Sequence, residues 1–225
     1  MSFADKKLSE IAISIPGSTA LLREYDLDFC CGGADTLGAA VAEKNLNLAE
    51  IEARLTELQE SKQQDDEQRW LTAPYAEIID HIIHRYHERH RAQLQELIVL
   101  AERVESVHGD RDDCPVGVAA ELHNVYADLS SHMMKEEQIL FPMIKMGNYA
   151  MARMPIQVME HEHAEHGEHL EVLKALTNNL TPPADACNTW RALYSGIKEF
   201  MDDLMMHIHT ENNILFPRVI EEGNR

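Results

Sequence analysis

Apolar residues recur every three or four positions over long stretches of the chain after residue 74, which is the pattern of helices that bury one face. The stretches are separated by short segments with Gly, Pro and Asp. They predict four long helices, at about residues 75–107, 116–146, 155–178 and 184–221. Pro155 is expected to open the third helix. Four long helices with short connections predict an up-down-up-down four-helix bundle.

Before residue 60 the runs of periodic apolar residues are shorter. Residues 15–29 and 34–45 favour short helices on either side of a Cys-Cys-Gly-Gly segment, and residues 47–59 favour a third helix. The stretch after it is polar and lacks periodicity, as expected of a linker. We therefore predict an all-α protein in three parts. These are a small Cys-containing domain at 1–60, a linker at 61–73 and the bundle at 74–225.

One motif occurs twice in the bundle. A His, a Glu four residues later and Leu-Phe-Pro four residues after that occur at His132 and again at His207, an offset of 75 residues. A weaker repeat aligns His87 with His163 and His90 with His166, an offset of 76 residues. The bundle is therefore expected to consist of two similar helical hairpins related by a pseudo-twofold axis.

The repeated motif predicts a metal site. His132 and Glu136 lie one turn apart on one helix face, as do His207 and Glu211, and apolar residues surround both pairs. Buried imidazole and carboxylate groups cost several kcal/mol unless they are satisfied, and a metal satisfies them. A single pair of this kind is commonly an exposed helix pair, but two copies in equivalent places argue against that alternative.

A site that draws on all four helices also needs ligands from the first and third. The repeat offers either His87 with His163 or His90 with His166, and the spacing does not choose between these pairs. Mixed imidazole and carboxylate ligands suit iron or manganese better than structural zinc.

Composition narrows the function classes. The net charge of −19 over 225 residues argues against binding to nucleic acid or to anionic membranes. No apolar run reaches the roughly 20 residues of a membrane span, and the first residues make a poor signal peptide. We expect a cytoplasmic protein.

Two of the four cysteines are adjacent. Cys30 and Cys31 are unsuited to a structural disulfide with each other because the ring would be strained. A helix start expected near Asp35 would lower a nearby thiol pKa, so the pair is a candidate for reactive transfer thiols. The alternative is that both are small buried residues. Cys114 and Cys187 are interpreted as incidental.

The remaining histidines have simpler interpretations. His209 lies about 200° around the helix from His207 and is expected to face solvent or an edge. His81, His84, His123, His161 and His169 are interpreted as surface or helix-interface residues. His90 and His166, if they are not ligands, could donate hydrogen bonds to the ligands.

The segments DFCCGG, YHERH, SSHMMKEEQILFP, VMEHEH and HIHTENNILFP resemble those of the RIC (repair of iron centres) family, over essentially the whole chain. The resemblance implies a hemerythrin-like bundle with two non-haem iron ions and a small Cys-containing domain. The ligands that it implies are His87, His132, Glu136, His163, His207 and Glu211. Asp128 and Glu162 would lie beside this site.

The same resemblance implies repair of iron–sulfur clusters damaged by nitric oxide or oxidants. The partners would then be iron–sulfur proteins with damaged clusters. Nitric oxide or dioxygen would be the small ligand, and the di-iron site could reduce nitric oxide as an enzyme. The protein could also form a homodimer. Two alternatives stay open. One is a sensor or carrier of dioxygen or nitric oxide without repair activity, and the other is a structural bundle whose His and Glu are only polar core residues.

Overall fold

The computed structural model describes residues 2–61 and 66–225, and the side chains of all of these except residues 66 and 67. The regular elements of these residues are helical, apart from one isolated bridge between Lys7 and Thr36. The predicted all-α fold is confirmed. None of the described helices is long and apolar enough to cross a membrane.

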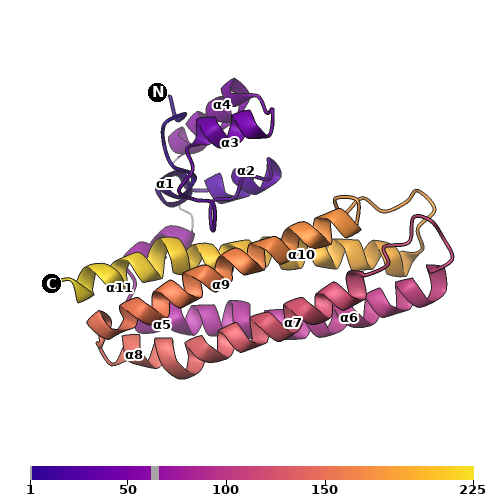
Figure 1. Ribbon diagram of the computed structural model, residues 1–225. Coiled ribbons are helices and arrows are strands. Elements are labelled where there is room, and N and C mark those ends of the chain that lie inside the picture. The colour runs from indigo at the N-terminus through magenta and orange to yellow at the C-terminus, as the bar shows by residue number, and fades with distance from the viewer. Residues whose placement is uncertain (1, 62–65) are drawn as a thin grey trace.

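Four long helices form the bundle, and three of them contain a short π-helical segment (Figure 1). The first consists of α5 (Tyr75–His81), η2 (Ile82–His87) and α6 (Glu88–His108). The second consists of α7 (Val118–Lys135), η3 (Glu136–Leu140) and α8 (Phe141–Lys145). The third is α9 (Tyr149–Leu176), and the fourth consists of α10 (Asn188–His209), η4 (Thr210–Leu215) and α11 (Phe216–Gly223).

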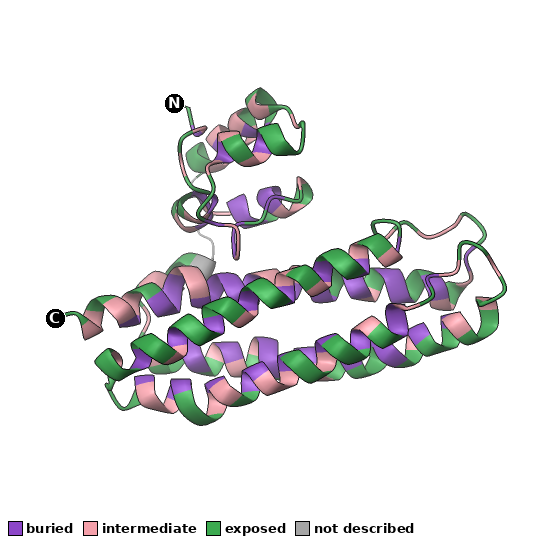
Figure 2. Cartoon of the chain, viewed as in Figure 1, coloured by how far each residue is buried: buried purple, intermediate pink, exposed green. Residues whose placement is uncertain are grey.

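The order of the helices around the bundle follows the order along the chain. The helix α6 packs against α7 and α10, and α9 packs against α7 and α11. Figure 2 shows buried residues along the inward faces of all four helices and exposed residues outside. The residues at the periodic apolar positions of the sequence therefore form the bundle core.

The third helix starts earlier than predicted. It begins at Tyr149, and Pro155 lies inside it rather than at its start. Proline removes one helical hydrogen bond, but packing holds the turns on either side of it, because Ala152 and Ile156 are fully buried. The second and fourth helices begin slightly later than predicted, at Val118 and Asn188.

The N-terminal unit is a small cluster of four helices with buried side chains of its own. They are α1 (Leu8–Ser14), α2 (Ser18–Glu24), α3 (Leu37–Glu43) and α4 (Leu48–Glu60). The helix α1 was not predicted. The side chains of Thr36 and Asn47 cap α3 and α4 by accepting hydrogen bonds from backbone amides, which explains where these helices begin.

The N-terminal unit packs onto the bundle beside α9 and α10 (Figure 1). The ammonium group of Lys174 on α9 lies 2.6 Å from the carboxylate of Asp26. The Asn213 amide donates to the carbonyl oxygen of Phe29, at 2.9 Å. These contacts place the loop between α2 and α3, which contains both adjacent cysteines, against the bundle.

The second half of the predicted linker, residues 66–73, packs on the bundle. Residues 62–65 lie outside the described residues, but η1 (Asp66–Leu71) is a 3₁₀ helix held on the bundle. Trp70 is buried and stacks on His81, with ring centroids 4.3 Å apart. The Arg218 guanidinium donates to the carbonyl oxygens of Trp70 and Ala73, both at 2.8 Å. The second half of the predicted linker is therefore anchored.

Candidate metal centre

The two Leu-Phe-Pro motifs end the π-helical segments in the second and fourth helices. The Phe141 amide donates to the carbonyl oxygen of Glu136, five residues back, and the Phe216 amide does the same to Glu211. The following proline has no amide hydrogen to continue this wider pattern. The widened turns begin at Glu136 and surround Glu211, and π segments of this kind are frequent at functional sites.

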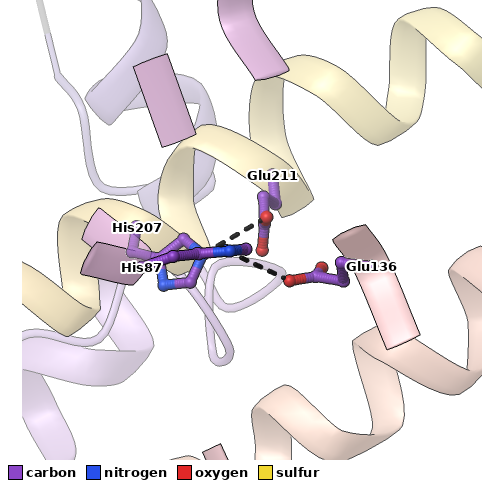
Figure 3. Close-up of side chains that lie close together, drawn as sticks. All are labelled: His87, Glu136, His207 and Glu211. Atoms are coloured by element: carbon purple, nitrogen blue, oxygen red, sulfur yellow. Dashed lines mark hydrogen bonds and ion pairs between the residues drawn. The ribbon is translucent and has the colours of Figure 1, made fainter. Parts of the chain in front are cut away.

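All six residues proposed as ligands are buried and face one another in the bundle core. They form two groups that share both glutamates. The first, here called the His87 group, consists of His87, His207, Glu136 and Glu211 (Figure 3). The second, the His132 group, consists of His132, His163, Glu136 and Glu211.

Each group brings one pair of imidazole nitrogens together. The Nε2 atoms of His87 and His207 are 3.1 Å apart, and those of His132 and His163 are 3.0 Å apart. Glu136 Oε2 lies 3.3 Å from His87 Nε2 and 3.4 Å from His132 Nε2. This single carboxylate oxygen therefore touches both groups.

Glu211 joins the two groups in a different way. Its Oε1 lies 3.3 Å from His207 Nε2, and its Oε2 lies 3.1 Å from His163 Nε2. Each oxygen of this carboxylate thus faces one group, so Glu211 could contribute one ligand atom to a cation in each group.

The donor separations fit two metal ions. Two ligand atoms that each lie about 2.1 Å from one ion, at right angles, are about 3 Å apart. The described nitrogens and oxygens converge at this spacing. The four carboxylate oxygens of Glu136 and Glu211 are buried and have no hydrogen-bond partner within the described structure. Within the described structure these carboxylates pair only with the imidazole Nε2 atoms, at 3.1 to 3.4 Å, and a cation in each group would balance their buried charge.

Outer hydrogen bonds orient three of the four histidine rings. His87 Nδ1 donates to Glu137 at 2.8 Å and His132 Nδ1 donates to Glu162 at 3.0 Å. His163 Nδ1 donates to the Asn212 side-chain oxygen at 2.8 Å. With the proton on Nδ1, each Nε2 presents its lone pair to the centre, as a metal ligand requires.

The electrostatics of the centre follow from its buried carboxylates. Burial works against protonation of His87 and His163, but neighbouring carboxylates outweigh it and raise the pKa of both rings to about 9. Without a metal, Nε2 of these two rings therefore also holds a proton at neutral pH, and a metal ion would bind there by displacing it. The hydrogen bond from His87 lowers the pKa of Glu137 to about 2, and the bond from His132 does the same for Glu162. The outer carboxylates are therefore ionised acceptors at neutral pH.

Two of these outer residues, Glu137 and Asn212, were missed in the sequence. Each directly follows a shared glutamate, and each accepts from one of the repeat-equivalent residues His87 and His163. The repeat itself was the signal that could have found them. The pseudo-symmetry ends at His207, whose Nδ1 has no acceptor among the described residues and whose ring instead stacks on Tyr86, with centroids 5.3 Å apart.

The two residues expected beside the centre have different positions. Glu162 contacts His132, as described, and also pairs with Lys135. Asp128 instead pairs with His169, at 3.2 Å. Only Glu162 therefore supports the centre directly.

His90 and His166 are buried next to the ligand rings. The His90 ring lies 5.3 Å from that of His207, and the His166 ring lies 4.9 Å from that of His132. Burial lowers the pKa of His90 well below its ordinary value and that of His166 to about 2. Both rings are therefore neutral packing partners, and neither hydrogen-bonds to a ligand within the described structure.

His209 corrects the sequence analysis, because it is buried with only 2% of its surface exposed. It does point away from the bundle core, but the N-terminal unit covers that face. Phe29 packs edge-on against its ring at 5.2 Å, and the Asn213 amide donates to its Nδ1 at 2.8 Å. His84, His123 and His161 are exposed, as expected.

The loop of Cys30 and Cys31 lies directly against the centre. The Cys31 thiol donates to the backbone carbonyl of His163 at 3.2 Å. The Asn212 amide donates to the carbonyl oxygen of Cys30 at 3.2 Å while its oxygen accepts from His163. Gly33 is required in this loop because a Cβ there would lie 2.5 Å from the Phe29 carbonyl oxygen.

The pKa of the Cys30 thiol is raised, whereas the sequence analysis expected it to be lowered. The hydrogen bond to Cys31, burial and the Asp28 carboxylate raise the pKa of Cys30 well above its ordinary value. The helix α3 begins only at Leu37, so its N-terminus is too far along the chain to offset these effects. Both thiols are free, and their transfer role stays a prediction.

Comparison with known families agrees with this geometry. Residues 78–219 match the hemerythrin HHE cation binding domain, and residues 4–59 match the ScdA_N domain, which is described as a domain of unknown function. The fold and the paired buried groups thus define a hemerythrin-type bundle that binds cations, with an ScdA_N domain preceding it.

The relatives narrow this class. The chain is 69% identical over 222 residues to a probable iron-sulfur cluster repair protein of Haemophilus influenzae, covering 99% of this chain and 100% of the relative. It is 58% identical over 220 residues to the iron-sulfur cluster repair protein YtfE of Citrobacter koseri, and 57% identical over 220 residues to that of Escherichia coli. Each of these two matches covers 98% of this chain and 99% of the relative. The chain belongs to the family of iron–sulfur cluster repair proteins, which confirms the resemblance that its motifs indicated.

Proposed function

We propose that this protein is a di-iron protein that repairs damaged iron–sulfur clusters. His87 and His207 would hold one iron and His132 and His163 the other, with Glu136 and Glu211 shared between them. The observation that carries the proposal is the convergence of buried Nε2 atoms on two carboxylates that have no hydrogen-bond partner among the described residues. Imidazole with carboxylate is a donor set that suits iron.

The protein's own residues orient and enclose the centre. Glu137, Glu162 and Asn212 hold three rings with their lone pairs inward. Burial of all six donor side chains excludes bulk water, which strengthens each charge interaction. Iron bound here would supply coordination positions for a small ligand such as nitric oxide or dioxygen, together with a store of metal.

The repair role extends to this chain what the names of its relatives say of those proteins. The targets would be cytoplasmic iron–sulfur proteins whose clusters nitric oxide or oxidants have damaged. Iron donation, nitric oxide binding or reduction, or both would serve this role. Cys30 and Cys31 favour repair over a simple gas carrier, because a carrier has no use for a thiol pair against its metal centre.

The test combines metal analysis with a repair assay. Protein purified without oxygen should hold two irons per chain and restore activity to an iron–sulfur enzyme damaged by nitric oxide. Glu136→Ala, Glu211→Ala should lose both the iron and the repair activity. His84→Ala is the matched control, since His84 is exposed on the outer face of the first helix, where it pairs with Glu88. Repair at the wild-type rate by the iron-free variant would refute the proposal.

The ligand assignment has its own test. His87→Ala should lower the iron content and change the optical spectrum, whereas His90→Ala should leave the iron content near two per chain, because only His87 directs a nitrogen at the glutamates. The reverse order would place the ligand one turn further along the helix.

A further inference from the structure

A cleft of about 650 Å³ lies between the N-terminal unit and the bundle helices α9 and α10. Its walls include Asp28, Cys30 and Cys31 from the loop of the N-terminal unit, and Met201 and Met205 from α10. Two thiols and two thioethers thus line one cavity. Sulfur donors of this kind select soft or borderline metal ions.

The charge of the cleft favours a cation over an anion. Six carboxylates line it, against four basic side chains. All four basic groups pair with carboxylates that also line the cleft, such as Lys174 with Asp26 and Lys198 with Asp202, so the cleft keeps an excess of two negative charges. A cavity lined by an excess of one sign of charge concentrates ions of the other sign.

Three donors in the wall of the cleft already lie close together. Asp28, Cys30 and Cys31 each offer a ligand atom within 4.8 Å of the other two. The two sulfur atoms are 3.9 Å apart, whereas two thiolates on one tetrahedral ion would be about 3.8 Å apart. Cys30 Sγ lies 3.1 Å from Asp28 Oδ1.

The loop backbone holds this arrangement in place. The Asp28 carboxylate accepts from the backbone amides of Cys30, Cys31 and Gly32, at 2.9, 3.0 and 2.9 Å. These bonds fix the direction of the carboxylate, as outer hydrogen bonds do for metal ligands. The three donors therefore need little rearrangement to meet one ion.

We propose that Asp28, Cys30 and Cys31 bind one thiophilic divalent cation, iron(II) in the cell, with a fourth position open to the cleft. The inference rests on the proposed function, because it adds a station through which iron passes between a damaged cluster and the bundle. On binding, two metal–sulfur bonds form and each thiol gives its proton to solvent. The metal keeps its charge state, so no electron donor or acceptor is needed.

The location explains why such a station would be useful. The Cys31 sulfur lies 3.2 Å from the carbonyl oxygen of His163, a member of the His132 group. Asn212 connects the Cys30 carbonyl to the His163 ring. An ion on the thiols is thus held against the same histidine that serves the bundle centre.

Cobalt(II) is a suitable probe. The full chain, with iron in the bundle, should be titrated without oxygen while thiolate-to-cobalt charge-transfer absorption, retained iron and released protons are measured. We expect one cobalt per chain, no loss of iron and two protons released. Absence of thiolate absorption from the wild-type protein would overturn the inference.

Variants locate the site. Cys30→Ser, Cys31→Ser should abolish the thiolate absorption while circular dichroism and bundle iron stay unchanged, and Asp28→Asn should weaken cobalt binding by about tenfold. Cys114→Ser, Cys187→Ser is the matched control and should bind cobalt as the wild type does. Absorption that survives in the Cys30, Cys31 variant, or disappears in the control, would contradict the assignment.

The repair assay separates this inference from the proposed function. A wild-type protein that repairs clusters but binds no cobalt at the thiols would refute only the thiol site. A protein that binds cobalt there but repairs nothing would refute the repair function and leave the site intact.

Discussion

At the scale of single residues, the centre depends on pairs of side chains rather than on ligands alone. The rings of His87, His132 and His163 each have an acceptor behind them. That acceptor sets which nitrogen carries the proton, and so which nitrogen can bind a metal. Glu162 is the best residue for testing this dependence, because it accepts from His132. Asp128 is a suitable comparison, because its carboxylate pairs with His169 and does not contact the centre.

We therefore expect Glu162→Gln to lower iron affinity by about ten- to a hundredfold, the range for loss of a hydrogen bond behind a metal ligand. The substitution keeps the shape of the side chain but removes the charge that His132 faces. Competition with a chelator measures the change. Asp128→Asn is the control and should alter the affinity by less than about twofold. Equal effects from the two substitutions would mean that only the overall charge matters.

At the scale of secondary-structure elements, the Leu-Phe-Pro motif acts through the backbone. Pro217 follows Phe216, whose amide closes the widened turn on the carbonyl of Glu211. A residue with an amide hydrogen at position 217 could bond to the carbonyl four residues back and favour the narrower α-helical turn. The direction of the Glu211 side chain depends on the width of that turn.

Pro217→Ala should therefore reduce iron affinity by about tenfold, as loss of ligand orientation does elsewhere, without unfolding the bundle. The measurements are chelator competition and the Tm of the metal-free protein. Pro155→Ala is the matched control, because Pro155 lies inside α9, which has no π segment. It should raise the Tm by restoring a helical hydrogen bond and leave iron binding unchanged. An unchanged affinity in Pro217→Ala would show that packing alone sets the widened turn.

The sequence predicted the elements better than it predicted their junctions. Long periodic runs identified the four bundle helices, and the repeat identified the two His–Glu pairs. The start of α9 was wrong because Pro155 was given the weight of a helix boundary, whereas packing of Ala152 and Ile156 carries the helix through it. At such a position the burial of neighbouring side chains outweighs the low helix propensity of proline.

At the scale of the whole molecule, the contact between the two parts was the feature that the periodicity could not reveal. His209 looked solvent-facing because the helical pattern records only which face meets the bundle core. The opposite face is buried beneath Phe29 of the N-terminal unit. Nothing in the spacing of one helix encodes what a distant segment will cover. This contact also links the Cys30 backbone to His163 through Asn212.

Removal of residues 1–65 tests what this contact does. The remaining chain keeps Trp70 and its bonds to Arg218, so we expect it to fold as a bundle with two irons. We also expect it to release iron to a chelator about tenfold faster, because Asn212 loses its partner at Cys30 and holds His163 less firmly. Circular dichroism checks the fold, and stopped-flow chelation measures the release rate.

Asn212→Ala in the full chain is the matched variant. It removes the bond to His163 while the N-terminal unit still covers the centre, so it separates orientation of the ring from shielding. If orientation dominates, Asn212→Ala releases iron as fast as the shortened chain. If shielding dominates, only the shortened chain is fast. Release at the full-chain rate by both proteins would show that the N-terminal unit, though packed against the centre, does not control how tightly the bundle holds its metal.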